Sequence, residues 1–229
     1  MRAADFFLGA RKAFSIVLGY LPLGFAYGAL ANLAGLELSL IAAMSLLVFA
    51  GSAQFIAVNM LAAGSGGLAV IATVFLVNLR HLLMSASLSP HLKACPRRVL
   101  PLLAFWLTDE NYAMACGELK KRERSYLYML GLFGTAYTGW VLGGILGGVF
   151  GRFFSSPDAA LTMGYALYAM FIFLIVIQAT ERRLLLAGAV SSLLAVVFYL
   201  YIPGSWYIIL ATACTATLGV MTEKWRRLS

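Results

Sequence analysis

Two adjacent acidic residues, Asp109 and Glu110, carry the strongest chemical signal in this sequence. Of the nine acidic residues in the chain, only these two lie well inside a long apolar segment. A carboxylate at membrane depth costs about 3 kcal/mol or more unless it is paired or hydrated, and it usually marks a functional site. The two acids therefore predict a site that carries protons. A purely structural ion pair with Arg80 is the alternative.

A second apolar segment, residues 66–89, contains Arg80 and His81. On a helix, one stripe of this segment carries four polar side chains, while Arg80 points elsewhere: Asn78, His81, Ser85 and Ser89. This stripe could line a polar path, and Arg80 could pair with a substrate carboxylate or with one of the two acids. His81 has an ordinary pKa of about 6.5 and could exchange protons at physiological pH. The alternative is that His81 only forms a hydrogen-bonded contact between two helices.

A third apolar segment, residues 39–63, is interrupted near its midpoint by Gly51-Ser52-Ala53-Gln54. Ser52 is expected to contribute to the polar site. Three roles stay open for Gln54: it caps an opened turn, binds an amino or carboxyl group of a substrate, or bridges two helices. Irregular backbone at membrane depth is tolerated only where it is buried in protein or lines a cavity.

Glycines recur at four-residue spacing in the segment 126–150 and just beyond it: Gly139, Gly143, Gly147 and Gly151. Small residues in this register let two helix backbones approach closely. The ladder predicts a tight helix-packing interface. The spacing does not say whether the partner helix belongs to this chain or to another protein.

The composition identifies the elements that must position these residues. Hydrophobic residues make up 62% of the 229 residues and charged residues 11%, against about 45–50% and about 25% in soluble domains. A soluble, disordered or disulfide-stapled protein is excluded. The chain is predicted to be a single all-α membrane domain, residues 1–229, that forms a polytopic bundle of eight hydrophobic segments. These segments are approximately 14–34, 39–63, 66–89, 99–117, 126–150, 159–178, 184–202 and 204–221.

The net charge of +8 comes mainly from Lys and Arg residues that lie between the apolar segments. Such residues set membrane topology, because positively charged loops stay in the cytoplasm. Eight full crossings would leave twelve bases inside and four outside. In the second arrangement, segment 99–117 and one of the first three segments, for which 39–63 is the natural candidate, each enter and leave on the same side. Fifteen bases then lie inside and only Arg152 lies outside, with Arg80 within the membrane. Both topologies stay open, with one or two segments broken or re-entrant. A nucleic-acid partner is not expected.

The sequence offers little support for catalysis. It has no nucleophile elbow, zinc-protease motif, P-loop or paired-cysteine motif, so neither an enzyme nor a metal or organic cofactor is expected. Gly64-Ser65-Gly66 faintly resembles an intramembrane serine protease motif. A membrane-embedded hydrolase that uses Ser65 and His81 is therefore one alternative. A uniporter or channel-like pore for small metabolites is the other.

Four motifs resemble the large subunit of the AzlC-type branched-chain amino acid exporters. They are Gly24-Phe25-Ala26-Tyr27-Gly28, Phe49-Ala50-Gly51-Ser52-Ala53-Gln54-Phe55, Asn78-Leu79-Arg80-His81 running into Met84-Ser85-Ala86-Ser87-Leu88, and Leu107-Thr108-Asp109-Glu110. The resemblance implies export of valine, leucine, isoleucine and also methionine, driven by an ion gradient. It also implies a small hydrophobic AzlD-type partner subunit.

Together these observations predict a multi-pass transporter of the cytoplasmic (inner) membrane that is surrounded by membrane lipids. The expected mechanism is proton-coupled alternating access. Asp109 and Glu110 would carry the proton, and Arg80 would pair with a carboxylate. The other members of the expected substrate and proton pathway are Ser52, Gln54, Asn78 and His81.

Overall fold

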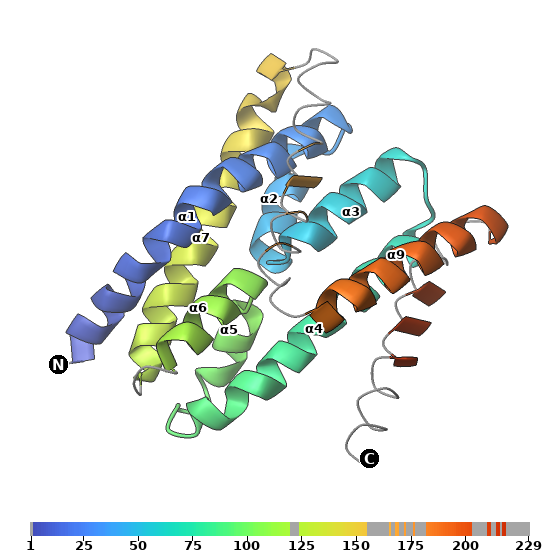
Figure 1. Ribbon diagram of the computed structural model, residues 1–229. Coiled ribbons are helices and arrows are strands. Elements are labelled where there is room, and N and C mark those ends of the chain that lie inside the picture. Colours follow the sequence, from blue (N-terminus) through green and yellow to red (C-terminus); the bar gives the residue numbers. More distant parts are fainter. Residues whose placement is uncertain are drawn as a thin grey trace, which may run out of the picture.

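The computed structural model describes residues 2–119, 124–154 and 182–202, with single residues between 165 and 176 and between 210 and 218. Within these ranges every regular element is a helix (Figure 1). Three stretches are long and apolar enough to cross a membrane, which agrees with the predicted all-α membrane bundle: Ala3–Leu33, Gly67–Leu92 and Tyr126–Phe153. The predicted segments 159–178 and 204–221 lie almost entirely outside the described residues.

Four predicted segments form continuous helices. Their bounds are α1 Arg2–Leu33, α4 Gly67–Leu88, α7 Tyr126–Phe150 and α9 Arg182–Tyr201. For α4, α7 and α9 these bounds lie within two residues of the prediction. The prediction for α1 was wrong at its start, because the helix begins twelve residues before the apolar stretch at residue 14. Apolarity identifies the part that a membrane can surround, whereas a helix continues into flanking residues that have good helix propensity, such as Ala3, Ala4 and Leu8.

The segments 39–63 and 99–117 are both broken, each into two half-helices. The first consists of α2 (Leu38–Leu47) and α3 (Gly51–Ala62), and the second of α5 (Leu100–Phe105) and α6 (Asp109–Leu119). The non-helical residues are 48–50 and 106–108. The polar residues that predicted the breaks mostly form the first turn of the second half-helix.

The half-helices α2 and α3 form a hairpin that enters from the upper end of the molecule, where α1 and α7 end (Figure 1). The first turn of α2 packs against Gly148 near the end of α7. Near the end of α2, the backbone oxygen of Leu46 accepts a hydrogen bond from Tyr137 at the middle of α7. α3 then turns back, and its Phe55 ring packs against Tyr27 in the second half of α1.

The half-helices α5 and α6 form a second hairpin that enters from the lower end, where α1 and α7 begin (Figure 1). At its tip, Trp106 packs against Tyr137 at the middle of α7, with ring centroids 5.5 Å apart. α6 then runs back to the lower end, where Glu118 pairs with Lys12 and Arg124. The order of one long helix followed by one hairpin thus occurs twice, in opposite directions. The two tips meet between α1, α4 and α7.

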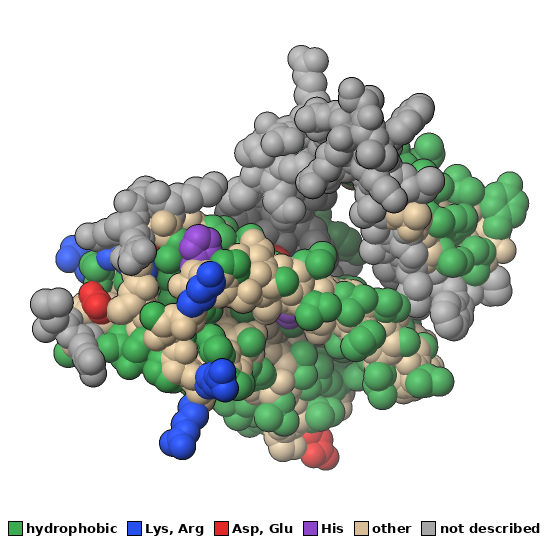
Figure 2. Space-filling model, turned by 90° about the horizontal axis from the view of Figure 1, so that it is seen from below, with side chains coloured by type: hydrophobic (Ala, Val, Ile, Leu, Met, Phe, Trp, Pro, Cys, Tyr) green, Lys and Arg blue, Asp and Glu red, His purple; other side chains and the backbone are tan. Residues whose placement is uncertain are grey.

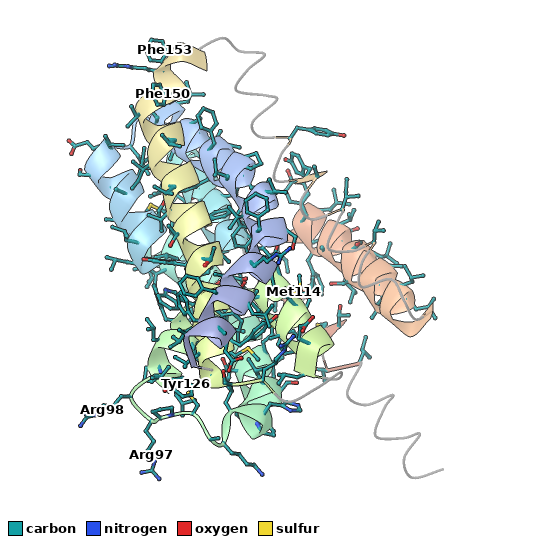
Figure 3. The ribbon with its side chains drawn as sticks, turned by 90° about the vertical axis from the view of Figure 1, so that its left-hand side faces the viewer. Arg97, Arg98, Met114, Tyr126, Phe150 and Phe153 are labelled. Carbon is teal, nitrogen blue, oxygen red and sulfur yellow. The ribbon has the colours of Figure 1, made fainter. Side chains whose placement is uncertain are left out.

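The two ends of the molecule differ in character. Figure 3 shows Arg97 and Arg98 projecting at the lower end, with Phe150 and Phe153 at the upper end. Figure 2 looks at the molecule from the lower end and shows exposed Lys and Arg side chains there. The exposed bases of this end include Lys93, which lies with Arg97 and Arg98 between η1 (Ser89–Leu92) and α5.

The glycine ladder, which comprises three glycines of α7 and Gly151 at the start of η2 (Gly151–Phe154), packs against α1 of the same chain. A Cβ atom on each of its four glycines would meet α1, in the pairs Gly139 with Val17, Gly143 with Leu21, Gly147 with Phe25 and Gly151 with Ala29. The partners advance by four residues on both helices, so α1 and α7 run parallel along one ridge. At Gly143 and Gly147 the atom in the way is a backbone oxygen, which cannot rotate aside.

We expect Gly147→Ala to reduce strongly the amount of folded protein, whereas Gly19→Ala is neutral or slightly stabilising. A methyl group at Gly147 overlaps the backbone oxygen of Phe25, and such overpacking costs about 3 kcal/mol. A Cβ on Gly19, in α1, meets nothing within 4 Å, so the higher helix propensity of Ala is the main effect there. The measurement is thermal unfolding of both purified variants in detergent. Equal unfolding temperatures for Gly147→Ala and Gly19→Ala would show that α1 and α7 do not need this close contact.

Candidate functional site

The tips of the two hairpins line a small, partly open cavity together with α1, α4 and α7. Its volume of about 20 Å³ leaves room for about one water molecule. Both half-helices that follow a break, α3 and α6, begin at this cavity. Its polar side chains are Tyr20, Ser52, Arg80, His81, Thr108, Asp109 and Glu110.

Arg80 connects the starts of the two half-helices. Its Nη1 lies 2.5 Å from Oδ2 of Asp109 in the first turn of α6, and its Nη2 donates a hydrogen bond of 2.7 Å to Oγ of Ser52 in the first turn of α3. The side chains of Arg80 and Asp109 are 31% and 20% exposed. Arg80 therefore connects the start of α3 to the start of α6. Hydrogen bonds within a single helix could not make this connection.

The run Thr108-Asp109-Glu110-Asn111 begins α6. Thr108 is the N-cap, because its Oγ1 accepts a hydrogen bond from the backbone N–H of Asn111. Asp109 and Glu110 occupy the first turn, where the helix dipole favours negative charge. Asn111 is fully buried and donates from Nδ2 to the backbone oxygen of Trp106 at the end of α5. A helix start at this point lets four consecutive polar residues find partners in different directions.

Glu110 has a different partner from Asp109. Its Oε2 accepts a hydrogen bond of 2.6 Å from the hydroxyl of Tyr20, whose oxygen also lies 2.7 Å from Oγ1 of Thr108. Tyr20 belongs to α1 and is 5% exposed. Within the described ranges, Asp109 forms an ion pair with Arg80, whereas no ion pair involves Glu110. The two acids therefore have distinct environments that their adjacency in the sequence does not reveal.

Gln54 is fully buried and joins α2 to α7. Its Nε2 donates a hydrogen bond of 2.7 Å to the backbone oxygen of Met44, near the end of α2, and its Oε1 accepts one of 2.8 Å from Nε1 of Trp140. Gln54 is not among the described residues that line the cavity. Of the three roles considered for it, this geometry matches capping of the opened turn and bridging of two helices.

The polar stripe of α4 is only partly in the cavity. His81 lines it, as does Arg80, which the helical spacing had placed on another face; the length of the Arg80 side chain lets it reach the same space. Asn78 is not among the described lining residues. Oδ1 of Asn78 and Nε2 of His81 are buried, and neither has a hydrogen-bond partner in the described part of the chain.

Sequence reasoning missed Tyr20, which holds Glu110 and Thr108. The only signal for it is that a buried tyrosine hydroxyl needs a partner, and the chain has 11 tyrosines. Trp140 was missed as well, although its indole N–H holds Gln54 and its ring lines the cavity. In both cases the residue comes from a helix far away in sequence, so no local pattern could identify it.

The site combines one cation, two carboxylates and a neutral tyrosine around a very small volume. Two helix N-termini also begin there, and backbone N–H groups in a first helical turn have no intrahelical acceptor. This arrangement offers complementary partners to a zwitterion: Arg80 and the N-terminal end of α3 for a carboxylate, and Asp109 or Glu110 for an ammonium group. It can also hold a proton on a carboxylate.

Comparison with known proteins places these observations in a family. The model of the AzlC protein family matches residues 15–154, which contain the whole cavity. The inner membrane protein YgaZ of Escherichia coli (strain K12) is 29% identical over 98% of this chain and 93% of its own length. An uncharacterized membrane protein of Helicobacter pylori (strain J99) is 31% identical over 76% and 77%, respectively.

The Bacillus subtilis (strain 168) protein named "Branched-chain amino acid transport protein AzlC" is 27% identical over 90% of this chain and 80% of its own length. No solved structure matches the chain. The family match covers more than half of the sequence and includes the motifs that build both half-helix starts. The chain belongs to the AzlC family of membrane proteins.

Proposed function

We propose that this protein is the large subunit of a two-component exporter that moves branched-chain amino acids out of the cytoplasm in exchange for protons. Membership of the AzlC family supports membrane transport, and one relative carries branched-chain amino acid transport in its name. Valine, leucine and isoleucine are the expected substrates, and methionine is a further candidate because it is a similarly sized apolar amino acid.

The observation that carries this proposal is the ion pair between Arg80 and Asp109 where the two chain breaks meet. A zwitterionic amino acid can replace this pair with two new ones, its carboxylate on Arg80 and its ammonium group on Asp109. No uncompensated charge is then left in a low-dielectric site during the exchange. Discontinuous helices that meet at the centre of the bundle build substrate sites in many secondary transporters.

Glu110 is the proposed proton carrier. Its described partner is the hydroxyl of Tyr20, and no ion pair within the described ranges involves it, so a proton that binds Glu110 would not have to displace a paired cation. This assignment divides the work between the two acids: Asp109 binds the substrate, and Glu110 carries the proton.

The cavity must enlarge before it can hold an amino acid. Small-molecule sites usually have volumes of roughly 300–1,000 Å³, far above the present volume of about 20 Å³. The α2–α3 hairpin reaches the cavity from the upper end and the α5–α6 hairpin from the lower end. Movement of one hairpin at a time would expose the site alternately to the two sides, as alternating access requires.

Charge predicts which end faces the cytoplasm. Among the described bases of residues 2–154, Arg152 lies at the upper end and Arg80 at the centre, and the others lie in the lower half. Positively charged loops stay in the cytoplasm, so the lower end is expected to face inward. This orientation corresponds to the arrangement with two re-entrant segments.

We expect an impermeant maleimide added outside intact cells to leave Lys93→Cys unlabelled, in a background without the native cysteines. The same reagent should label Lys93→Cys in inverted vesicles. Arg152→Cys, at the opposite end, is the matched control and should label in intact cells. Labelling of position 93 from outside would support eight full crossings or the reverse orientation.

Efflux measurements test the function directly. Cells that lack the protein and cells that overproduce it, together with its small partner, would be fed dipeptides of leucine, valine or isoleucine. The deletion should raise the internal concentration of the released amino acid, and overproduction should lower it. An imposed pH gradient should drive efflux against the concentration gradient; purely downhill movement would indicate a uniporter or pore. Unchanged internal concentrations in all strains would contradict export.

The hydrolase alternative requires Ser65 and His81 to lie close together, and they do not. Ser65 precedes α4, while His81 lies fourteen residues after its first residue, Gly67. At 1.5 Å per residue this spacing separates them by roughly 20 Å along the helix. A nucleophile and its general base need hydrogen-bonding distance. These two residues therefore do not form a nucleophile–base pair.

The proposed AzlD-type subunit must dock on a surface other than the glycine ladder, because α1 already covers the ladder. Co-purification of the two chains from cells that produce both tests this part of the proposal. The expected result is a stable complex that survives mild detergent.

A further inference from the structure

A second, larger cavity lies below the first, between the end of α4, η1 and α5. Its volume is about 350 Å³, which falls within the usual range of roughly 300–1,000 Å³ for small-molecule sites. Its wall contains five leucines: Leu88, Leu92, Leu100, Leu103 and Leu107. Of these, Leu88, Leu103 and Leu107 are at most 2% exposed, so the inner wall is apolar and belongs to the core.

The two cavities are separated by the tip of the α5–α6 hairpin. Leu107 in this tip lines the large cavity, and the next residue, Thr108, lines the small one. On α4, His81 lines the small cavity and Ser85 lines the large one, which Ser89 at the start of η1 also lines. Residues four apart on a helix lie one above the other. The predicted polar stripe of α4 therefore runs from one cavity into the other.

The outer wall of the large cavity is basic. Lys93 and Arg97 both line it and are both exposed, and no described lining residue is acidic. The cavity thus offers two cations near an apolar pocket large enough for a branched side chain. A carboxylate attached to an aliphatic chain matches both features. An ammonium group has no counterion among the described lining residues.

We propose that this large cavity is the entry vestibule of the exporter, which receives the substrate by its carboxylate and its aliphatic side chain, with Leu107 as the gate to the central site. The inference rests on the proposed export function. In the vestibule Lys93 and Arg97 attract the carboxylate, the leucines accommodate the side chain, and the ammonium group stays hydrated. Movement of the hairpin tip then passes the substrate to Arg80 and Asp109.

Two fragments of leucine distinguish this chemistry from that of the central site. 4-Methylpentanoate lacks the ammonium group, and 3-methylbutylamine lacks the carboxylate. In inverted vesicles that contain the chain with its small partner, uptake of labelled leucine corresponds to export. The acid should inhibit this uptake competitively and at lower concentration than the amine. Equal inhibition, or stronger inhibition by the amine, overturns the assignment.

The variant Lys93→Gln/Arg97→Gln should raise the KM for leucine by about tenfold, as expected for lost hydrogen bonds to a charged group. It should also remove the advantage of the acid over the amine. Arg98→Gln removes the same charge from the same loop but not from the cavity lining, and should behave like the wild type. Equal KM values in the wild type and both variants overturn the vestibule and leave export standing. No leucine uptake by the wild type overturns both proposals.

A labelling experiment tests occupancy without transport. Ser89→Cys, in a background without native cysteines, places a thiol in the cavity wall, and leucine should slow its reaction with a maleimide. Ser87→Cys is the matched control, because Ser87 is exposed two residues earlier, near the end of α4, but is not among the described residues that line the cavity; leucine should not protect it. Protection of position 89 by phosphatidylglycerol but not by leucine would make the cavity a lipid site and overturn the proposal.

Discussion

Replacing Asp109 by Asn is expected to abolish efflux and also substrate exchange, while most of the folded protein remains in the membrane. Asn has nearly the same shape and can still accept a hydrogen bond from Arg80, which lies 2.5 Å from Asp109. It cannot provide the charge that the substrate ammonium group needs. Removing one partner of a desolvated charge pair weakens binding by about 100-fold or more.

The measurement combines efflux, exchange and protein level in Asp109→Asn, Arg80→Gln and the double variant. Three outcomes are distinguishable. Loss of exchange with normal protein level supports a substrate-binding role for Asp109. Retained exchange with lost uphill efflux would make Asp109 the proton carrier. A lower protein level in each single variant that recovers in the double variant would identify a purely structural pair, because an orphaned buried charge costs about 3 kcal/mol.

Replacing Glu110 by Gln is expected to uncouple the transporter: exchange of leucine across the membrane continues, but a pH gradient no longer drives uphill efflux. Gln keeps the size of Glu110 and can accept the hydrogen bond from Tyr20, yet it cannot bind or release a proton. Efflux in the variant should therefore be independent of the imposed gradient. The check is leucine movement in vesicles at several pH gradients, together with leucine–leucine exchange at equal pH.

Tyr20→Phe serves as the matched control for Glu110→Gln. It removes the hydroxyl that contacts Glu110 and Thr108 but keeps the ring against Phe49 and Trp140. Efflux should become slower, and it should still respond to the gradient. If Glu110→Gln responds to the gradient like the wild type, another group carries the proton, and His81 in the same cavity is the next candidate.

The different effects expected for Asp109→Asn and Glu110→Gln follow from tertiary contacts that sequence reasoning did not supply. Along the chain, Asp109 and Glu110 are neighbours of the same chemical type. In the fold, Asp109 faces α4 and pairs with Arg80, whereas Glu110 faces α1 and binds Tyr20. Adjacent residues on a helix point about 100° apart, so each can meet a different neighbouring helix.

The sequence by itself predicted an all-α membrane bundle, the positions of most of its described apolar helices, and the two segments whose polar interruptions allowed a break. These properties depend on local composition. A stretch of about 20 apolar residues suits a spanning helix, and a polar run such as Thr108-Asp109-Glu110-Asn111 is also a strong signal for a helix start. The bounds of α4, α7 and α9 agreed with this reasoning, whereas the sequence had left open whether one, both or neither of the interrupted segments is broken.

Only the tertiary structure decided which residues meet. It placed the glycine ladder against α1, showed that Gln54 bridges α2 and α7, brought in Tyr20, and directed the two hairpins from opposite ends to a common centre. Helix formation is governed by neighbours within four residues, which the sequence displays directly. The contacts of the site join residues about 30 to 90 positions apart, and these depend on how whole helices pack against each other.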